Sequence, residues 1–352
     1  MKIGIVGLPN VGKSTVFNAL TAGYAPSSNY PFCTIEPNRG VVEIPDERLE
    51  ELASFVMAKE KRPVTVEFVD IAGLIKGASK GEGLGNRFLS HIREVNVILH
   101  VVRCFKDPQI SHPFPEIEPV RDIEIVNLEL IMADLQMVED RLKKLKEPND
   151  SRDVLSKVKG YLERGESIAS IVFEQKEILD TMGFLTSKPT IYVANIKEDD
   201  EESLTFAEEV RRKADGEGSK VIVLPAKLEE EISHLADEEK EEYRRELGIE
   251  EKLKKLINIC YDALGFITFY TIAHQKVSAW SVREGTSAKE AAGKVHSEMK
   301  EGFIKAEVIP FVELMRYTSY QEAKDDGKLR IEGKDYIVKD GDVLYFKFHI
   351  IS

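Results

Sequence analysis

A glycine-rich segment close to the N-terminus combines the residue types that hold polyphosphates. Residues 7–15 read G-L-P-N-V-G-K-S-T, and an apolar strand pattern precedes them at residues 2–6. The order matches the pattern G-x-x-x-x-G-K-[ST], in which glycines allow a tight turn and backbone N–H groups surround phosphate oxygens. We expect Lys13 to reach the β- and γ-phosphates and Ser14 to supply a hydroxyl to Mg²⁺. The pattern predicts a nucleoside triphosphate site, whose other contacts in this loop are Asn10, Val11, Gly12 and Thr15.

A second motif, D-I-A-G at residues 70–73, follows an apolar strand pattern. A carboxylate at the end of a strand can hold Mg²⁺ through water, and the amide of Gly73 can meet the γ-phosphate. In the segment 29–38, Thr34 is placed to complete the Mg²⁺ shell in the triphosphate state. Gly73 therefore joins Lys13 among the predicted catalytic residues, and the predicted metal ligands are Ser14, Thr34 and Asp70.

Hydrolysis needs a group that orients the attacking water, and the residue after this motif does not provide one. Many GTPases carry glutamine there, whereas Leu74 has no polar group. His112 is one candidate for the role, because an imidazole can accept a hydrogen bond from water near neutral pH. The alternative is a structural or solvated loop histidine. Spacing alone leaves both interpretations of His112 open.

The element that reads the base is expected after a later strand, where residues 195–198 read N-I-K-E. Guanine-specific proteins use Asn-Lys-x-Asp, in which the aspartate accepts two hydrogen bonds from guanine. Glu198 is one methylene longer than aspartate and Ile196 replaces the lysine, so this geometry is lost. A later loop is expected to close over the base. The sequence therefore predicts an adenine site, and its predicted contacts are Asn195, Ile196, Glu198 and Ala226.

Alternating strand and helix patterns are expected to position these motifs. Apolar runs at residues 3–6, 64–69 and 97–102 indicate a doubly wound, mostly parallel sheet of the α/β class. Helical spacing takes over between residues 123 and 182, and strand patterns return after residue 190, which indicates an insertion. The predicted domains are a discontinuous P-loop domain at 1–120 and 187–262, a helical insertion at 121–186 and a small α+β domain at 266–350.

Composition indicates a globular chain and limits its surroundings. The 352 residues are 42% hydrophobic and 32% charged, which is enough apolar content for a large core. The formal net charge of −13 argues against broad, sequence-independent wrapping of nucleic acid. No apolar run approaches membrane-spanning length, and the Met-Lys start leads directly into a strand pattern, so we expect no membrane contact and no signal peptide. Three cysteines without metal-ligand spacing fit a reducing cytoplasm.

Taken together, these motifs closely resemble the YchF group of Obg-related P-loop proteins, the Obg-like ATPases. The resemblance rests on the phosphate loop and on the segments 29–38, 70–74, 76–86, 195–198 and 333–342. It covers essentially the whole chain. It implies a P-loop G domain that is interrupted by a coiled-coil-like insertion and followed by a β-grasp module of the type called TGS.

The resemblance also implies a chemistry and a set of partners. It implies hydrolysis of ATP in preference to GTP, with a hydrophobic residue at Leu74 in place of the catalytic glutamine and with His112 as the residue that positions water. Asn10 resembles the asparagine with which some related enzymes recruit K⁺ beside the phosphates. The family is associated with ribosomes and stress responses, so ribosomal RNA or protein is expected to contact the insertion and the TGS module. A monomer and a nucleotide-dependent dimer are both open.

Three functional hypotheses follow. The first is a cytoplasmic regulatory ATPase whose hydrolysis switches the conformation of residues 73–86 and of Thr34. The second is a nucleotide-sensing scaffold with negligible hydrolysis, which Leu74 keeps open because it replaces glutamine. The third is a conventional ribosome-associated GTPase, in which a register slip gives the guanine-reading role to Asp199. The relative affinity for ATP and GTP separates the first hypothesis from the third.

Overall fold

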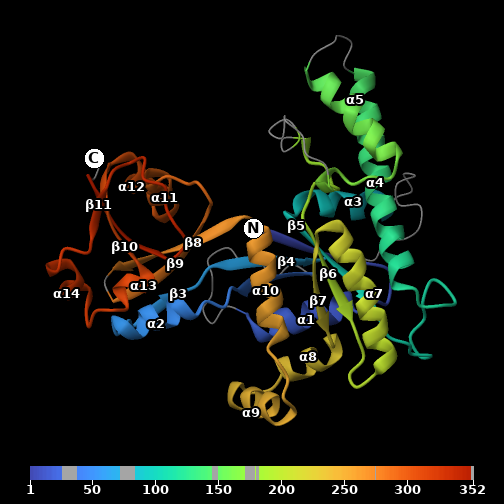
Figure 1. The fold of residues 1–352 in the computed structure, drawn as a ribbon, viewed down its shortest axis with the longest axis horizontal. Helices are drawn as coiled ribbons and strands as arrows, with labels where there is room; N and C mark the ends of the chain where they lie inside the picture. The colour runs from blue at the N-terminus through green and yellow to red at the C-terminus, as the bar shows by residue number, and fades with distance from the viewer. Residues whose placement is uncertain are drawn as a thin grey trace. The chain divides into compact units, whose positions relative to one another are not determined.

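Two compact units make up the computed structural model, which describes residues 1–25, 38–71, 84–144, 150–170, 179, 182–273 and 275–349 (Figure 1). The first unit comprises Met1–Val42 and Val66–Cys260, and the second comprises Glu43–Thr65 and Tyr261–Ser352. Across the described ranges, no helix has both the length and the apolar character needed to cross a membrane.

A six-stranded sheet in the order β2-β4-β1-β5-β6-β7 forms the centre of the first unit. The strand β1 pairs in parallel with β4 and β5, and β5, β6 and β7 continue the parallel pairing. Every residue of β5 is buried, as expected for a parallel strand covered on both faces. This arrangement is the mostly parallel sheet of the α/β class that the sequence predicts. The strands are β1 (Lys2–Val6), β2 (Arg39–Glu43), β4 (Thr65–Asp70), β5 (Val97–Arg103), β6 (Thr190–Asn195) and β7 (Lys220–Leu224).

Local signals set the ends of the helices around this sheet. The helix α7 (Glu201–Glu217) begins after Asp200, whose carboxylate accepts a hydrogen bond from the Glu202 N–H, and it ends at Gly218 with φ of 68°. The helix α1 follows Gly12, which has a φ of 98°. The other helices of this unit are α1 (Lys13–Gly23), α3 (Leu84–Glu94), α4 (Pro119–Lys144), α5 (Asp150–Glu163), the short η2 (Ile168–Ser170), α8 (Ala226–Ser233), α9 (Asp237–Leu247) and α10 (Lys252–Ala263), which leads into the second unit.

The helices α4 and α5 form an arm that projects from the sheet (Figure 1). Apolar residues of α4 pack against α5 and the returning chain, in a cluster that includes Val138, Val158 and Phe184. Midway along α4, the fully buried carboxylate of Asp134 accepts hydrogen bonds from the N–H groups of Leu185 and Thr186 at 3.0 and 2.8 Å. This carboxylate ties the returning chain to α4. We keep residues 121–186 as the proposed extent of the insertion.

The second unit contains a separate six-stranded sheet in the order β11-β10-β12-β8-β9-β3. The helix α11 (Ala288–Val295) packs its alanines against Phe269, Val308 and Leu344 in the core of this unit. The remaining elements are β3 (Glu60–Arg62), β8 (Phe266–Ala273), β9 (Lys276–Arg283), β10 (Phe303–Pro310), β11 (Arg330–Glu332), β12 (Asp342–Phe348), α2 (Glu47–Phe55), α12 (Ser297–Glu301), α13 (Phe311–Leu314) and α14 (Tyr320–Asp325).

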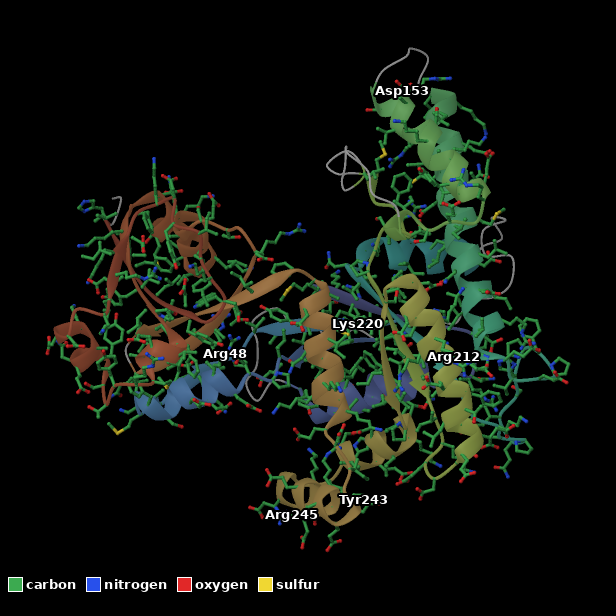
Figure 2. The ribbon with its side chains drawn as sticks, viewed as in Figure 1. Arg48, Asp153, Arg212, Lys220, Tyr243 and Arg245 are labelled. Carbon is green, nitrogen blue, oxygen red and sulfur yellow. The ribbon has the colours of Figure 1, made fainter. Side chains whose placement is uncertain are left out.

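The composition of the second unit differs from the predicted domain limits. Residues 43–65 were predicted to belong to the P-loop domain at 1–120, but they pack with the C-terminal residues. The strand β3 pairs in parallel with β9, and Arg48 on α2, labelled in Figure 2, donates to Asp340 Oδ2 at 2.6 Å. All three residues of β3 are exposed and charged, so no hydrophobic pattern revealed a partner more than two hundred positions away.

Replacing Asp134 with alanine is expected to lower the free energy of unfolding by about 2–3 kcal/mol, because the N–H groups of Leu185 and Thr186 lose their buried acceptor. Denaturant-induced unfolding followed by circular dichroism measures the change. Asp140→Ala is the matched control, because Asp140 lies on the same helix but is exposed. Equal losses for the two variants would contradict the bracing role of Asp134.

Candidate nucleotide-binding site

A cavity of about 940 Å³ lies in the first unit at the carboxyl ends of β1, β4, β5 and β6. Ligands of open α/β sheets bind at this edge, because the loops that follow parallel strands converge there. The phosphate loop lines one side and the start of α8 lines another. The lining residues are Pro9, Asn10, Gly12, Lys13, Ser14, Thr15, Asp70, Phe105, Asp107, Ile110, Asn195, Ile196, Lys197, Lys227 and Glu230.

Close packing of the phosphate loop requires its glycines. Gly7 and Gly12 have φ values of 148° and 98°. A Cβ atom on Gly7 would lie 2.4 Å from the carbonyl oxygen of Val101 on β5, and one on Gly12 would lie 2.3 Å from Asn195 Nδ2. The loop therefore presses against β5 and β6, and α1 starts at Lys13 with its N-terminal N–H groups beside the cavity. A helix N-terminus and a tight loop of this kind favour a bound anion.

Lys13 is buried, and its Nζ donates to the carbonyl oxygen of Leu8 at 2.8 Å within the loop. Burial lowers the pKa of Lys13, and the negative charge of Asp70 partly opposes this shift. A phosphate in the cavity would stabilise the charged form of the amine further. The position of Lys13 suits the predicted contact with the β- and γ-phosphates.

Ser14 and Asp70 form the part of the site that suits a divalent cation. The Ser14 hydroxyl donates to Asp70 Oδ2 at 2.6 Å. The other carboxylate oxygen, Oδ1, is buried and has no hydrogen-bond partner among the described residues. Hydroxyl and carboxylate oxygens are the ligands that Mg²⁺ prefers, directly or through water. An unsatisfied carboxylate oxygen beside a hydroxyl, at the edge of a phosphate loop, therefore fits this ion.

The Asn195 side chain connects two of the loops that surround the cavity. Its Nδ2 donates to the carbonyl oxygen of Val11 at 2.9 Å, and its Oδ1 accepts from the N–H of Ala226 at 3.1 Å. One buried side chain thus joins the phosphate loop to the loop that was predicted to close over the base. The amide still has a second hydrogen and a second lone pair for the base. The contact between Asn195 and the base stays a prediction.

The residues around Asn195 divide between two cavities. Ile196 lines the phosphate cavity, whereas Glu198 lines a neighbouring depression of about 660 Å³ together with Asp199 and Lys252. Ala226 is buried and contributes its backbone N–H to Asn195, and its neighbour Lys227 supplies the side chain that lines the phosphate cavity. The structure therefore brings Ile196 to the predicted nucleotide site and keeps Glu198 out of its lining.

The loop after β5 forms a wall that the sequence analysis did not assign. Phe105, Asp107 and Ile110 line the cavity, held by the buried guanidinium of Arg103, which donates to their three carbonyl oxygens at 3.1 to 3.2 Å. Further along the loop, Ser111 accepts a hydrogen bond from Asn10 Nδ2 at its Oγ, at 2.9 Å. The position of the loop at the carboxyl end of a predicted strand was the signal that could have found it.

His112 is held away from the cavity. Its Nε2 lies 3.0 Å from Asp122 Oδ2 and its Nδ1 lies 3.1 Å from the carbonyl oxygen of Phe114, and His112 does not line the cavity. Burial raises the pKa of Asp122, while His112 and Arg121 oppose this shift. In this arrangement both ring nitrogens of His112 bind groups outside the phosphate loop, which differs from the position expected of a group that orients water. Its catalytic role stays a prediction.

Some predicted residues lie outside the described residues. They include the metal ligand Thr34, the catalytic Gly73 and the hydrophobic Leu74. Within the described residues, the structure brings the phosphate loop, Asp70, Asn195 and Ile196 to one cavity. This set comes from segments that are far apart in the sequence.

Comparison with known proteins finds relatives of similar length. Residues 2–144 match the family described as "50S ribosome-binding GTPase", and residues 266–349 match the family YchF-GTPase_C, described as "Protein of unknown function (DUF933)". The chain is 47% identical to "Ribosome-binding ATPase YchF" of Bacillus subtilis and 46% identical to the protein of the same name of Escherichia coli O157:H7, with 99% of both chains covered in each case. The solved structure of the YchF GTPase of Schizosaccharomyces pombe matches 99% of this chain and 97% of that chain, with a TM-score of 0.89 and 34% identity.

Asn195→Asp is expected to weaken the binding of ATP and GTP analogues about tenfold, because a carboxylate cannot donate to the Val11 carbonyl oxygen and adds negative charge beside the phosphates. Equilibrium titration with fluorescent analogues measures the change. Asn96→Asp is the matched control, since the Asn96 side chain accepts a hydrogen bond from the Lys2 N–H through its Oδ1, an atom that aspartate keeps. Unchanged affinity in Asn195→Asp would show that this connection between the loops is unnecessary for binding.

Proposed function

The chain belongs to the YchF family of P-loop nucleoside triphosphate hydrolases, and from that premise we propose that it is a ribosome-associated ATPase that prefers ATP to GTP. The phosphate cavity carries the proposal: Lys13, the N-terminus of α1 and the Ser14–Asp70 pair lie around one space of about 940 Å³. The bacterial relatives carry the name "Ribosome-binding ATPase YchF" and match over 99% of the chain, which supports both the substrate and the partner.

Binding of the triphosphate follows from the arrangement of the loop. The backbone N–H groups of residues 7–13 and the N-terminus of α1 would hold the phosphate oxygens, and Lys13 would exchange the Leu8 carbonyl oxygen for phosphate. The N–H of Gly73 is proposed to contact the γ-phosphate. Leu74 cannot orient the attacking water, so we keep His112 as the proposed positioning group.

Mg²⁺ is the proposed cofactor, and the residues present fit it. Ser14 Oγ and Asp70 would hold the ion, with Thr34 as the third proposed ligand. When bound, the ion neutralises charge on the phosphates. K⁺ is a second proposed ion: Asn10 directs its amide nitrogen to Ser111, which leaves its carbonyl oxygen as the atom suited to a cation.

The preference for ATP is supported by the residues that follow β6. Ile196 lines the cavity at the position where guanine-specific proteins carry lysine, and Glu198 does not line it. The carboxylate at the position of the guanine-reading aspartate, Glu198, is therefore absent from the lining of this cavity. Adenine needs no such acceptor, and Asn195 retains hydrogen-bonding capacity for the base edge.

A conventional GTPase is the second candidate. The similar fission yeast protein is titled a YchF GTPase, and Asp199 lies beside Glu198 in the neighbouring depression with a φ of 53°. A nucleotide-sensing scaffold with negligible hydrolysis is the third, because His112 is engaged with Asp122 and Phe114. Nucleotide affinities and turnover separate the three.

The proposed partner is the ribosome, through ribosomal RNA or protein. The α4–α5 arm and the C-terminal unit are the proposed contact surfaces, and the basic residues Arg141, Lys143 and Lys144 at the end of α4 can meet phosphates. The names of the bacterial relatives support a cytoplasmic location. The proposed oligomeric state is a monomer or a nucleotide-dependent dimer.

Equilibrium binding of fluorescent ATP and GTP analogues tests the function. ATP is expected to bind at least about tenfold more tightly than GTP, because Glu198, at the position of the guanine-reading aspartate, does not line the cavity. Lys13→Ala is expected to lose about a hundredfold or more of the turnover. Tighter binding of GTP would move the function to a GTPase, and binding without turnover would favour the scaffold.

Asp70→Asn is expected to raise the Mg²⁺ concentration for half-maximal turnover about tenfold, because the neutral amide attracts the ion less strongly than the carboxylate. Turnover measured over a Mg²⁺ titration checks this. Asp107→Asn, in the loop after β5 that also lines the cavity, is the matched control and is expected to leave the Mg²⁺ requirement unchanged. An identical Mg²⁺ requirement in wild type and Asp70→Asn would remove Asp70 from the ion site.

A further inference from the structure

The surroundings of His112 carry an inference about how hydrolysis is regulated. The side chains of His112 and Asp122 are only 5% and 3% exposed. His112 Nε2 is 3.0 Å from Asp122 Oδ2, and Nδ1 is near the backbone of Phe114, 3.1 Å from its carbonyl oxygen and 3.3 Å from its N–H. We call this set of contacts the histidine latch.

Both ring nitrogens are occupied in either protonation state. In the neutral ring, Nε2–H donates to Asp122 and Nδ1 accepts from the Phe114 N–H. In the charged ring, Nε2–H donates to Asp122 and Nδ1–H donates to the Phe114 carbonyl oxygen. Neither state leaves a nitrogen for water. The arrangement therefore differs from a triad, in which an aspartate orients one nitrogen while the other faces the reacting group.

Asp122, which accepts the hydrogen bond from His112 Nε2, is part of the arm. Asp122 lies in the first turn of α4, whose 26 residues run from the base of the arm into its packed core. The second oxygen of Asp122, Oδ1, accepts a hydrogen bond from Arg121 at 3.2 Å. Arg121 also donates to Glu118, and its guanidinium carbon lies 4.4 Å from the centre of the Phe114 ring. The first turn of α4 thus contacts His112 through Asp122 and its neighbour Phe114 through Arg121.

The loop that carries His112 also contacts the nucleotide site. Ser111 accepts a hydrogen bond from Asn10 of the phosphate loop, and Arg103 holds the preceding loop by its carbonyl oxygens. Adjacent Cα atoms are about 3.8 Å apart, so His112 begins one residue from a side chain that touches the phosphate loop. The backbone of His112 is therefore directly joined to a residue that contacts the phosphate loop.

We propose that Asp122 is a positioning residue that holds His112 in a resting state, and that displacement of the first turn of α4 releases His112 to orient the attacking water. The inference rests on the proposed ATPase function and adds its regulation. Contact of a partner with the arm then raises hydrolysis through α4, because the arm and the acceptor of His112 are parts of the same helix.

Steady-state ATP turnover of Asp122→Asn and Asp122→Ala tests the latch. The basal kcat is expected to rise in the order wild type, Asn, Ala, reaching about tenfold for alanine, because a charge-assisted hydrogen bond is first weakened and then removed. The KM for ATP is expected to stay the same, since Asp122 does not line the cavity. Asp140→Ala, on the exposed part of the same helix, is the matched control.

Variants that lack His112 distinguish the release of His112 from a general loosening of the structure as the cause of higher turnover. His112→Ala is expected to lower turnover, and the double variant Asp122→Ala/His112→Ala is expected to match it. A fall in kcat for Asp122→Asn would show that Asp122 orients His112 productively, and an unchanged kcat would show that the contact has no effect on hydrolysis. Either result, or a rise that persists without His112, would overturn the proposal.

Chemical modification of His112 tests the latch without any measurement of ATP turnover. Carbethoxylation of His112 by diethylpyrocarbonate, mapped by peptide mass spectrometry, is expected to be slow in wild type and about tenfold faster in Asp122→Ala, because modification needs an available ring nitrogen. Denaturant unfolding confirms that the variants are folded. If the wild-type protein hydrolyses no ATP, either alone or with isolated ribosomes, the proposed function is contradicted. If His112 reacts equally fast in the wild type and in folded Asp122→Ala, the latch is contradicted.

Discussion

The close approach of the phosphate loop to strands β5 and β6 is the constraint on which the rest of the site depends. A Cβ atom on Gly7 or Gly12 would overlap Val101 or Asn195, so the loop can occupy this position only with glycine at both points. That position directs the backbone N–H groups and the start of α1 toward one cavity. It also lets Asn195 reach the Val11 carbonyl oxygen and brings Asn10 to Ser111.

Buried polar side chains hold the elements around that loop. Asn195, Arg103 and Asp134 each bind backbone groups of segments that are distant or irregular. The partners named for them are carbonyl oxygens, N–H groups and the Thr186 hydroxyl rather than opposite charges. A buried polar group is costly unless it is satisfied, so each one favours a single arrangement of the chain it binds. Together with the contact between His112 and Asp122, these side chains link the nucleotide cavity, the loop after β5 and the arm.

The second unit is built from two separate parts of the chain. The chain leaves the first sheet at the end of β2 and returns to it at the start of β4. The two ends of the intervening segment are joined by a hydrogen bond of 2.8 Å from the Ile44 N–H to the Val64 carbonyl oxygen. The strand β4 then ends at Asp70, the proposed ion ligand. The segment between these two strands of the first sheet therefore belongs to the second unit, and the chain passes between the units more than once.

The sequence by itself determined the class of the fold, and it predicted which residues would gather at the phosphate site. Residues 7–15 and Asp70 act over short distances within strand–loop–helix units, so their spacing is enough to predict their positions. The tertiary structure decided the partners of residues that no local pattern connects: β3 with β9, Asn195 with Val11, Glu198 in a neighbouring depression, and His112 with Asp122. These pairings depend on which loops and helices meet when the sheet closes, and a single charged strand or loop histidine has no periodicity that encodes them.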